Sequence, residues 1–273
     1  MKFNEYEYEH LDLEKIKENF LELIESFEKA ENVEVQIEAF DEIIKLRNHI
    51  ETMQTLVSIR HSIDTNDEFY DKENEYMDEI SPILFGFTND FYKALVNSKF
   101  KDELIKKYGK LLFDLAENTL KVFSNEIIPD AQEENRLSSK YSKLIASAKI
   151  DFDGKELNLS QMVPYTQSKD RNVRIEAAKK VAQFFAENQE EFDNIYDSLV
   201  KVRTKMAQKM GYKNYVEFGY KQLSRLEYDA KMVEGYRKQV LENIVPLHTE
   251  LRKRQEKRLG VEKLRFYDEA IKF

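Results

Sequence analysis

The four histidines are the first side chains to test for metal or acid–base chemistry: His10, His49, His61 and His248. No two of them lie three or four residues apart. No helix face can therefore present two imidazoles to one zinc ion, as an HExxH helix does. Single histidines at such spacing are more often surface or packing residues. The spacing predicts no metal-binding and no catalytic residue in this chain.

Other catalytic motifs are missing from the sequence as well. The chain has no cysteine, which excludes disulfides, thiolate metal sites and a cysteine nucleophile. It contains no G-x-x-x-x-G-K-[ST] phosphate loop, no G-x-G-x-x-G dinucleotide turn and no G-x-S-x-G serine-hydrolase elbow. Carboxylates are plentiful, but on helices this acidic they do not indicate a particular reaction.

A tyrosine-rich segment, MAQKMGYKNYVEFGY at residues 206–220, interrupts two long charged patterns. Gly211 is a residue type that ends helices in a left-handed conformation, and four aromatic residues follow it. Tyrosine combines apolar area with a hydroxyl, so these rings could line a channel for peptide. Their periodicity alone favours ordinary helix packing. The aromatic residues are Tyr212, Tyr215, Phe218 and Tyr220.

A basic run, LRKRQEKRLG at residues 251–260, could bind an anionic partner. Lys257 and Arg258 precede Gly260, however, and cations in the last turn of a helix complement its dipole, so a solvated helix end is favoured. The formal net charge of −9 argues against nucleic acid or anionic membrane as partners. No apolar run approaches the roughly 18 residues of a membrane span, and the acidic N-terminus lacks a signal-peptide pattern. We expect a soluble, cytoplasmic protein.

The elements that position these residues are expected to be helices. Charged residues make up 35% of the 273 residues, against seven glycines and four prolines. Asp12 can cap a first helix, a second pattern runs from Ile37 to Val57, and a third begins near Tyr70 and should bend or break at Pro82. A fourth helix is expected from 104 to 123. These patterns predict an up-and-down array of long helices.

One β-hairpin and further helices are expected in the second half of the chain. The segment SAKIDFDGKELNLSQ, residues 147–161, switches to period 2 around Asp153-Gly154, a strong hairpin signal. From residue 173 to 206 the apolar spacing predicts one very long helix, or two nearly collinear ones broken at Asn188. Pro246 suits the first turn of a last helix, and Gly260 suits its C-terminal cap. From the residues alone, the function of such a protein stays unknown.

The sequence resembles the oligoendopeptidase F branch of the thimet oligopeptidase family of zinc metallopeptidases. The resemblance is carried by KYSKLIASAKIDFDGKELNLSQM (140–162), SKDRNVRIEAAKKVAQFF (168–185), VRTKMAQKMGYKNYVEFGYKQLSRLEYDAKMVEGYRKQV (202–240) and PLHTELRKRQEKRLGVEKLRFYD (246–268). It implies an all-α, neurolysin-like N-terminal half with long antiparallel helices and one hairpin. It also implies three regions: a helical array (1–110), a helix and hairpin region (111–180), and the first helices of a catalytic-domain channel wall (181–273).

The resemblance further implies a zinc-dependent oligopeptidase that hydrolyses short peptides inside a deep helical channel. In that family an HExxH helix and a later glutamate bind zinc, whereas this sequence reaches Phe273 without an HExxH motif. We therefore expect the chain to supply channel wall and to bind no zinc by itself, its partner being a C-terminal catalytic half. The alternative is a non-catalytic helical scaffold or binding module.

An exposed apolar surface is expected on the final helices, where a catalytic half would pack. Self-association through these helices could also cover it, because isolated proteins rarely expose large apolar patches. The residues expected in this surface are Tyr236, Val240, Ile244, Leu247 and Leu251, with Leu264, Phe266, Ile271 and Phe273 in the tail.

Overall fold

The computed structural model describes residues 3–271, and 77% of the structure is helical with a single two-stranded hairpin. The predicted fold class is thereby confirmed. The chain divides into two compact units, which we describe separately: unit one holds residues up to 140 and residues 197–226, and unit two holds residues 141–196 and 227 onward. The predicted divisions at 110 and 180 concern sequence regions and stay a prediction. None of the described helices combines the length and apolar composition of a membrane span.

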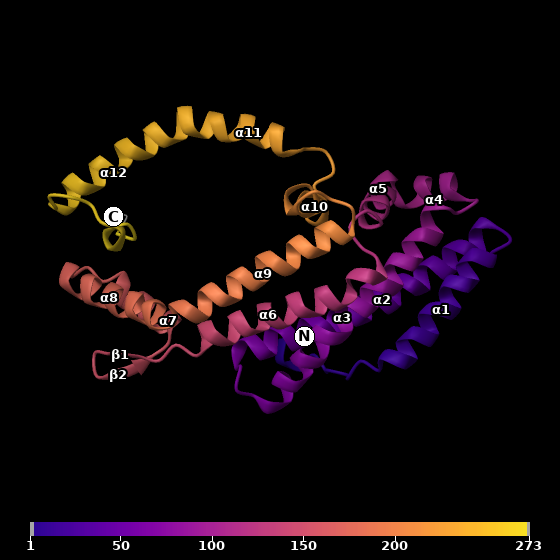
Figure 1. The fold of residues 1–273 in the computed structure, drawn as a ribbon, viewed down its shortest axis with the longest axis horizontal. Helices are drawn as coiled ribbons and strands as arrows, with labels where there is room; N and C mark the ends of the chain where they lie inside the picture. Colours follow the sequence, from indigo (N-terminus) through magenta and orange to yellow (C-terminus); the bar gives the residue numbers. More distant parts are fainter. Residues whose placement is uncertain (1–2, 272–273) are drawn as a thin grey trace. The chain divides into compact units, whose positions relative to one another are not determined.

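Unit one is built on three long helices that pack side by side (Figure 1). The side-chain oxygens of Asp12, Asn32 and Asp67 cap their first turns, as predicted for Asp12. The core between them is rich in phenylalanine, and burying each ring stabilises the fold by roughly 1.5–3 kcal/mol. The elements of this unit are η1 (Phe3–Glu5), α1 (Leu13–Lys29), α2 (Val33–Ile63), α3 (Glu68–Val96), α4 (Lys101–Tyr108), α5 (Lys110–Thr119), η2 (Asn125–Ile127), most of α6 (Ile128–Ala146) and of α9 (Gln189–Lys209), and α10 (Tyr215–Gln222).

Pro82 lies inside α3, which continues through it, so of the predicted bend or break the break does not occur. Proline lacks the N–H that would bond the carbonyl four residues earlier, here that of Asp78. Asn135 of α6 donates its Nδ2–H to this carbonyl at 3.0 Å, and Gln132 donates to the next carbonyl, that of Glu79, at 2.8 Å. Helix α6 therefore supplies from outside the donor that the proline removes.

The prediction of a single helix from residue 104 to 123 is wrong. The structure has two helices there, α4 and α5, separated at Gly109. This residue has φ +88°, a backbone conformation that glycine adopts easily and that cannot continue a helix. The apolar periodicity persists across the break because Leu104 and Phe113 are both buried in the same core.

Unit two contains the predicted hairpin, with Asp153 and Gly154 both at positive φ in the turn. Ile150 pairs with Leu157, and both are buried. The long pattern that begins at residue 173 forms two helices, α8 and α9, which are separated at Asn188, and not one very long helix. The elements are β1 (Ile150–Phe152), β2 (Lys155–Leu157), α7 (Leu159–Thr166), α8 (Arg171–Glu187), α11 (Ala230–Gln239), the π-helix η3 (Val240–Ile244), α12 (Val245–Leu259) and η4 (Phe266–Asp268).

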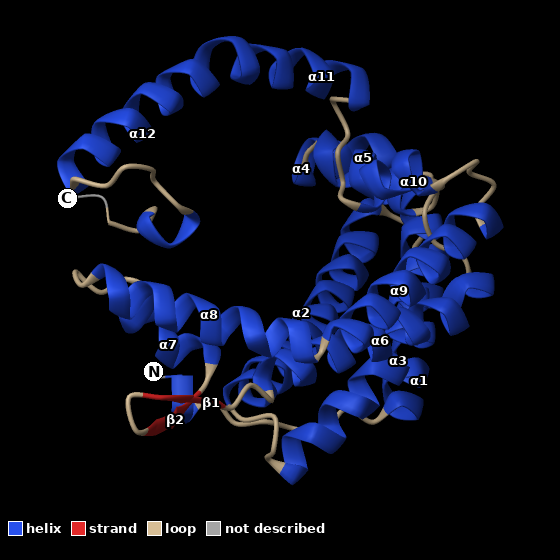
Figure 2. Ribbon diagram, turned by 60° about the vertical axis from the view of Figure 1, so that its left-hand side comes forward, coloured by secondary structure: helices blue, strands red, loops and turns tan. Residues whose placement is uncertain are grey.

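Helices α11 and α12 form one continuous helical arm with η3, residues 230–259, rather than separate helices (Figure 2). Pro246 lies in the first turn of α12, where its missing N–H costs little because the π-turn already shifts the bonding pattern. Gly260 ends the arm in the left-handed conformation, as predicted. The short turn η4 follows and packs on α8 within the same unit.

Candidate functional site

The histidines lie apart and bond to carboxylates or remain exposed. His61 is buried, with Nε2 3.1 Å from Asp71, and His10 Nδ1 lies 2.9 Å from Glu73. Among residues 3–271 no group of three or more histidine or acidic side chains is arranged to hold a metal ion. The zinc that the family resemblance implies therefore does not fit the described residues, and no catalytic step is assigned to them.

The tyrosine-rich segment is held by packing and capping. The α9 helix ends at Lys209, and Gly211 follows in the left-handed conformation. The Gly211 N–H donates to the carbonyl of Gln208 and the Tyr212 N–H to that of Ala207, which caps the helix. Phe218 is fully buried in a cluster with residues of α9 and the α5–α6 connection. The Tyr212 hydroxyl donates to the carbonyl of Lys121 at 3.0 Å. The packing interpretation thus accounts for these rings.

The tyrosine hydroxyls of this segment are partly removed from water. Burial raises the pKa of Tyr212 and of Tyr215 above the usual value, so both stay protonated at neutral pH. Tyr215 donates to the side chain of Gln222 at 2.8 Å, and Tyr220 lies under the guanidinium of Arg225 at 4.6 Å. None of these contacts requires a peptide ligand, so the channel-lining role stays a hypothesis.

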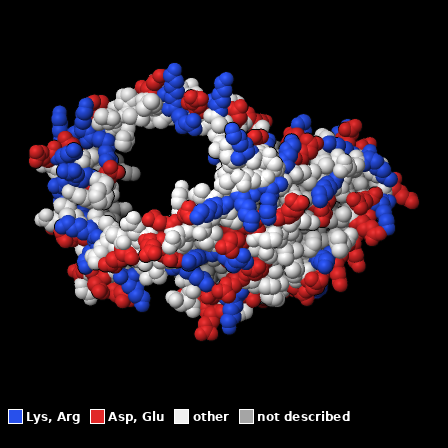
Figure 3. Space-filling model, viewed as in Figure 1, with Lys and Arg blue, Asp and Glu red and all other residues white. Residues whose placement is uncertain are grey.

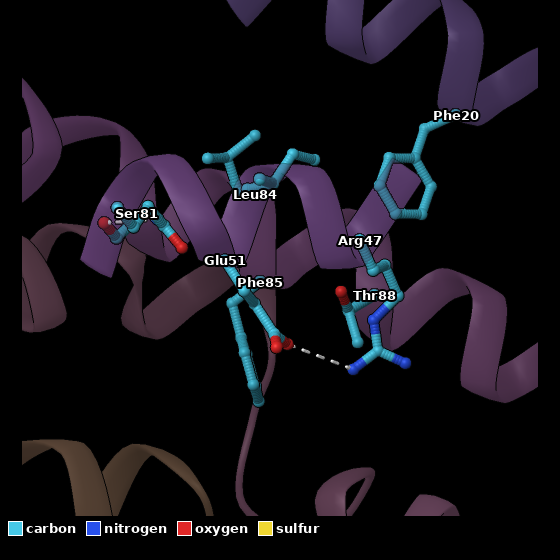
Figure 4. A pocket seen from close by; sticks show the side chains of 9 residues that line it. Phe20, Arg47, Glu51, Ser81, Leu84, Phe85 and Thr88 are labelled. Atoms are coloured by element: carbon cyan, nitrogen blue, oxygen red, sulfur yellow. Dashed lines mark hydrogen bonds and ion pairs between the residues drawn. The ribbon is translucent and has the colours of Figure 1, made fainter. Parts of the chain in front are cut away.

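A cavity of about 210 Å³ opens between α1, α2 and α3 in unit one (Figure 4). Four of its five polar side chains are engaged with each other: Arg47 lies 3.8 Å from Glu51, and Gln54 donates to Ser81 at 2.9 Å. Ligand pockets usually measure about 300–1,000 Å³. Because the cavity is small and most of its polar side chains are paired, we assign no ligand to it. The apolar part of its lining is Phe20, Ile50, Leu84 and Phe85.

The strongest polar cluster of unit two surrounds Asp268, which is fully buried. Arg171 donates to both carboxylate oxygens, from Nε at 3.0 Å and from Nη2 at 2.9 Å. Arg174, itself 2% exposed, donates from Nη2 at 2.8 Å, and the backbone N–H of Arg265 adds a fourth bond at 3.0 Å. These hydrogen bonds, that of Arg171 foremost, hold the pKa of Asp268 well below its usual range, against the opposing effect of burial.

The same arginine pair also binds backbone carbonyls. Arg174 donates to the carbonyls of Tyr267, Ser168 and Lys169 at 3.0, 2.7 and 3.1 Å, so the guanidinium joins the turn before α8 to the tail. No local sequence pattern indicates this cluster. Arg171 and Arg174 lie 97 and 94 residues before Asp268, so the sequence near each of them does not reveal the partner.

The basic run of α12 is partly engaged with the tail that follows it. Arg252 pairs with Glu269, and Arg258 donates to the carbonyl of Ile271 at 3.1 Å. Lys257 and Arg258 lie in the last turn, as the helix-dipole interpretation predicted. Figure 3 shows Lys and Arg side chains gathered over this end of α12. Structural contacts therefore occupy part of the run.

The apolar surface predicted on the final helices is present. Tyr236 is 68% exposed, and no residue of α11 or of η3 is buried. Val240, Leu264 and Ile271 are partly buried, and Phe273 lies outside the described residues. Helices of water-soluble proteins normally bury one apolar face, so this arm lacks a covering partner within the described chain. The other predicted residues with exposed side chains are Ile244, Leu247, Leu251 and Phe266.

Comparison with curated proteins found no match. Two family profiles match the chain: Peptidase M3 N-terminal domain over residues 3–123 and Peptidase family M3 over residues 164–271. They cover each half of the sequence in the order expected for one protein.

Solved structures match the fold along the whole chain. A Bacillus anthracis protein assigned to oligoendopeptidase F is 50% identical with a TM-score of 0.97, over 100% of this chain and 50% of that one. PZ peptidase A, solved with an inhibitor, is 52% identical with a TM-score of 0.96, over 98% of this chain and 48% of its own. Oligoendopeptidase-F from Enterococcus faecium, 18% identical with a TM-score of 0.63, shares the fold over 94% of this chain and 56% of its own. This chain spans about half the length of the first two, and with both profiles matched it belongs to peptidase family M3, on the oligoendopeptidase F branch.

Proposed function

We propose that the chain is the N-terminal part of a zinc-dependent oligopeptidase that hydrolyses short peptides inside a deep helical channel. The observation that carries the proposal is the 50% identity over the whole chain to a protein assigned to oligoendopeptidase F. In this proposal residues 181 onward form channel wall. We also propose a cytoplasmic location, which the absence of cysteine favours.

The proposal assigns channel wall to this chain and the chemistry to the remainder of the parent protein, because of what the described residues contain. They offer helical walls and an exposed apolar arm, and they contain no set of side chains suited to a metal. The metal-binding and proton-transfer groups are therefore assigned to the part of the relatives that this chain does not span. That part is also the partner we propose for the apolar face of the arm.

The test is a reconstitution assay. The chain is purified alone and together with the separately expressed remainder encoded by the parent gene, and cleavage of a quenched fluorogenic peptide is followed with and without a zinc chelator. We expect no cleavage by the chain alone and chelator-sensitive cleavage by the pair. Cleavage by the chain alone, or one zinc per chain that survives dialysis against a weak chelator, would contradict the proposal.

The reading frame of the source gene distinguishes the alternative function. A frame that continues into HExxH supports the peptidase, whereas a native stop after codon 273 supports a helical scaffold or binding module. The scaffold would also cover the arm by self-association, which light scattering at rising protein concentration detects. A monodisperse monomer in the presence of a soluble second half that does not bind would argue against the proposed partner.

A further inference from the structure

The arm, residues 230–259, has few ties to the rest of unit two. Its one buried residue is Gln255, in α12. Among the described residues of the unit, the C-terminal segment, residues 264–271, lies between α12 and α8 and bonds to both. A long helix with no buried face is not held in place by apolar packing. Its position must therefore depend on this segment.

The C-terminal segment binds α12 through one amide side chain in particular. Gln255 Nε2 lies within hydrogen-bond distance of three carbonyls of the segment, those of Asp268, Glu269 and Ile271, at 3.2, 3.3 and 2.7 Å. Glu256 accepts from the backbone N–H of Leu264 at 2.8 Å. These bonds fix the segment to the last turns of the helix.

On its other side the segment binds α8 mainly through the carboxylate of Asp268, beside single bonds from Arg174 to the carbonyl of Tyr267 and from Arg171 to that of Lys263. Arg171 and Arg174 lie in the first turn of α8, and together they donate three hydrogen bonds to this one group. The carboxylate is fully buried, so water cannot replace a lost donor. Removing one member of such a cluster leaves an uncompensated buried charge.

We propose that Asp268 is a positioning residue, the ionic latch that fixes the arm to α8. Without its charge the segment detaches from α8, and the arm moves as a body on the loop that joins it to α10. If the proposed function holds, the latch also sets where the apolar face of the arm meets the rest of the peptidase. The positional claim itself concerns unit two alone.

The absence of cysteine makes a distance measurement direct. Lys180→Cys on α8 and Arg254→Cys on α12 place one spin label on each exposed side of the latch. Pulsed electron paramagnetic resonance should give a narrow distance distribution in the parent and a broad one after Asp268→Asn. Hydrogen exchange of the segment amides should accelerate at least about a hundredfold, the factor that loss of a buried ion pair implies.

Two further variants make the outcome decisive. Glu269→Gln removes the neighbouring exposed ion pair with Arg252 and should leave the distribution narrow. Arg171→Gln removes two of the four hydrogen-bond donors while Arg174 remains, and should broaden the distance distribution partially. If hydrogen exchange shows that Asp268→Asn also unfolds α8, the Arg171→Gln variant provides the test. A distribution that stays narrow in both Asp268→Asn and Arg171→Gln, or broadens equally in Glu269→Gln, overturns the latch.

These measurements use the chain alone, so they are independent of the peptidase proposal. Adding the second half of the parent tests whether Asp268 also affects where the apolar face of the arm binds. We expect Asp268→Asn to weaken that binding by about tenfold or more, because a mobile arm must be ordered again on association. If the second half fails to bind the parent chain, the proposed function fails while the latch result stands.

Discussion

The proline in α3 allows a sharp test, because the structure identifies a donor that replaces its missing N–H. Asn135 bonds the carbonyl of Asp78, the one that Pro82 leaves without its intrahelical donor. Asn135→Ala removes this donor at a partly buried position, which should cost about 1–2 kcal/mol of unfolding free energy. In a Pro82→Ala background the new backbone N–H can reach the same carbonyl. The cost of Asn135→Ala should then fall by about 1 kcal/mol.

The assay is urea unfolding followed by circular dichroism at 222 nm for the four members of the cycle. The effect of Pro82→Ala itself does not enter, since only the difference between the two backgrounds is used. Asn74→Ala is a matched control: Asn74 also joins α3 to α6, by a 3.0 Å bond to Ser139. Its cost should be equal in both backgrounds. If Asn135→Ala costs the same with and without Pro82, the replacement of the donor is refuted.

Two other predictions concern the stability effect of a turn glycine, Gly154, and the pH dependence that Asp268 gives to unfolding. Gly154→Ala should destabilise the chain by about 1–2 kcal/mol in urea unfolding because φ is +70°, while Gly235→Ala, with no heavy atom within 4 Å of the added carbon, should stabilise α11 by about 0.5–1 kcal/mol; equal effects would contradict the turn geometry. The pKa of Asp268 is lowered on folding, chiefly by Arg171. Its contribution to the free energy of unfolding is therefore complete above the pKa of the unfolded state, about 3.9, and is lost progressively as the pH falls below that value. Urea unfolding between pH 6 and 3 should therefore show a steeper loss for the parent than for Asp268→Asn, and identical slopes would refute this.

Local patterns predicted the features that depend on neighbouring residues. The Asp153-Gly154 dipeptide set the hairpin because both turn positions need positive φ. Asp12 and Gly260 marked helix ends because caps act within one turn. The same apolar periodicity was misleading from 104 to 123, since it runs on through Gly109 although the backbone turns there.

The features that escaped prediction depend on partners far along the chain. The donor that replaces the missing N–H of Pro82 is a side chain 53 residues away along the chain, and nothing near Pro82 reveals Asn135. The Asp268 cluster likewise joins residues more than 90 positions apart. For the candidate site, the sequence offered two kinds of information. The histidine spacing argued against a zinc-binding pair on one helix, and the resemblance indicated the family.

Each of the two units is built from two separate stretches of the chain, which affects how the protein folds during synthesis. Unit one needs residues 197–226, because Phe218 and Met206 pack against Val122 and Phe123, and Lys205 and Lys209 pair with the buried carboxylate of Asp130. On a ribosome the residues between 140 and 226 take on the order of ten seconds to add. During that interval the first unit has an incomplete core and an unpaired buried acid. A nascent chain stopped near residue 140 should therefore be a chaperone substrate rather than a folded domain.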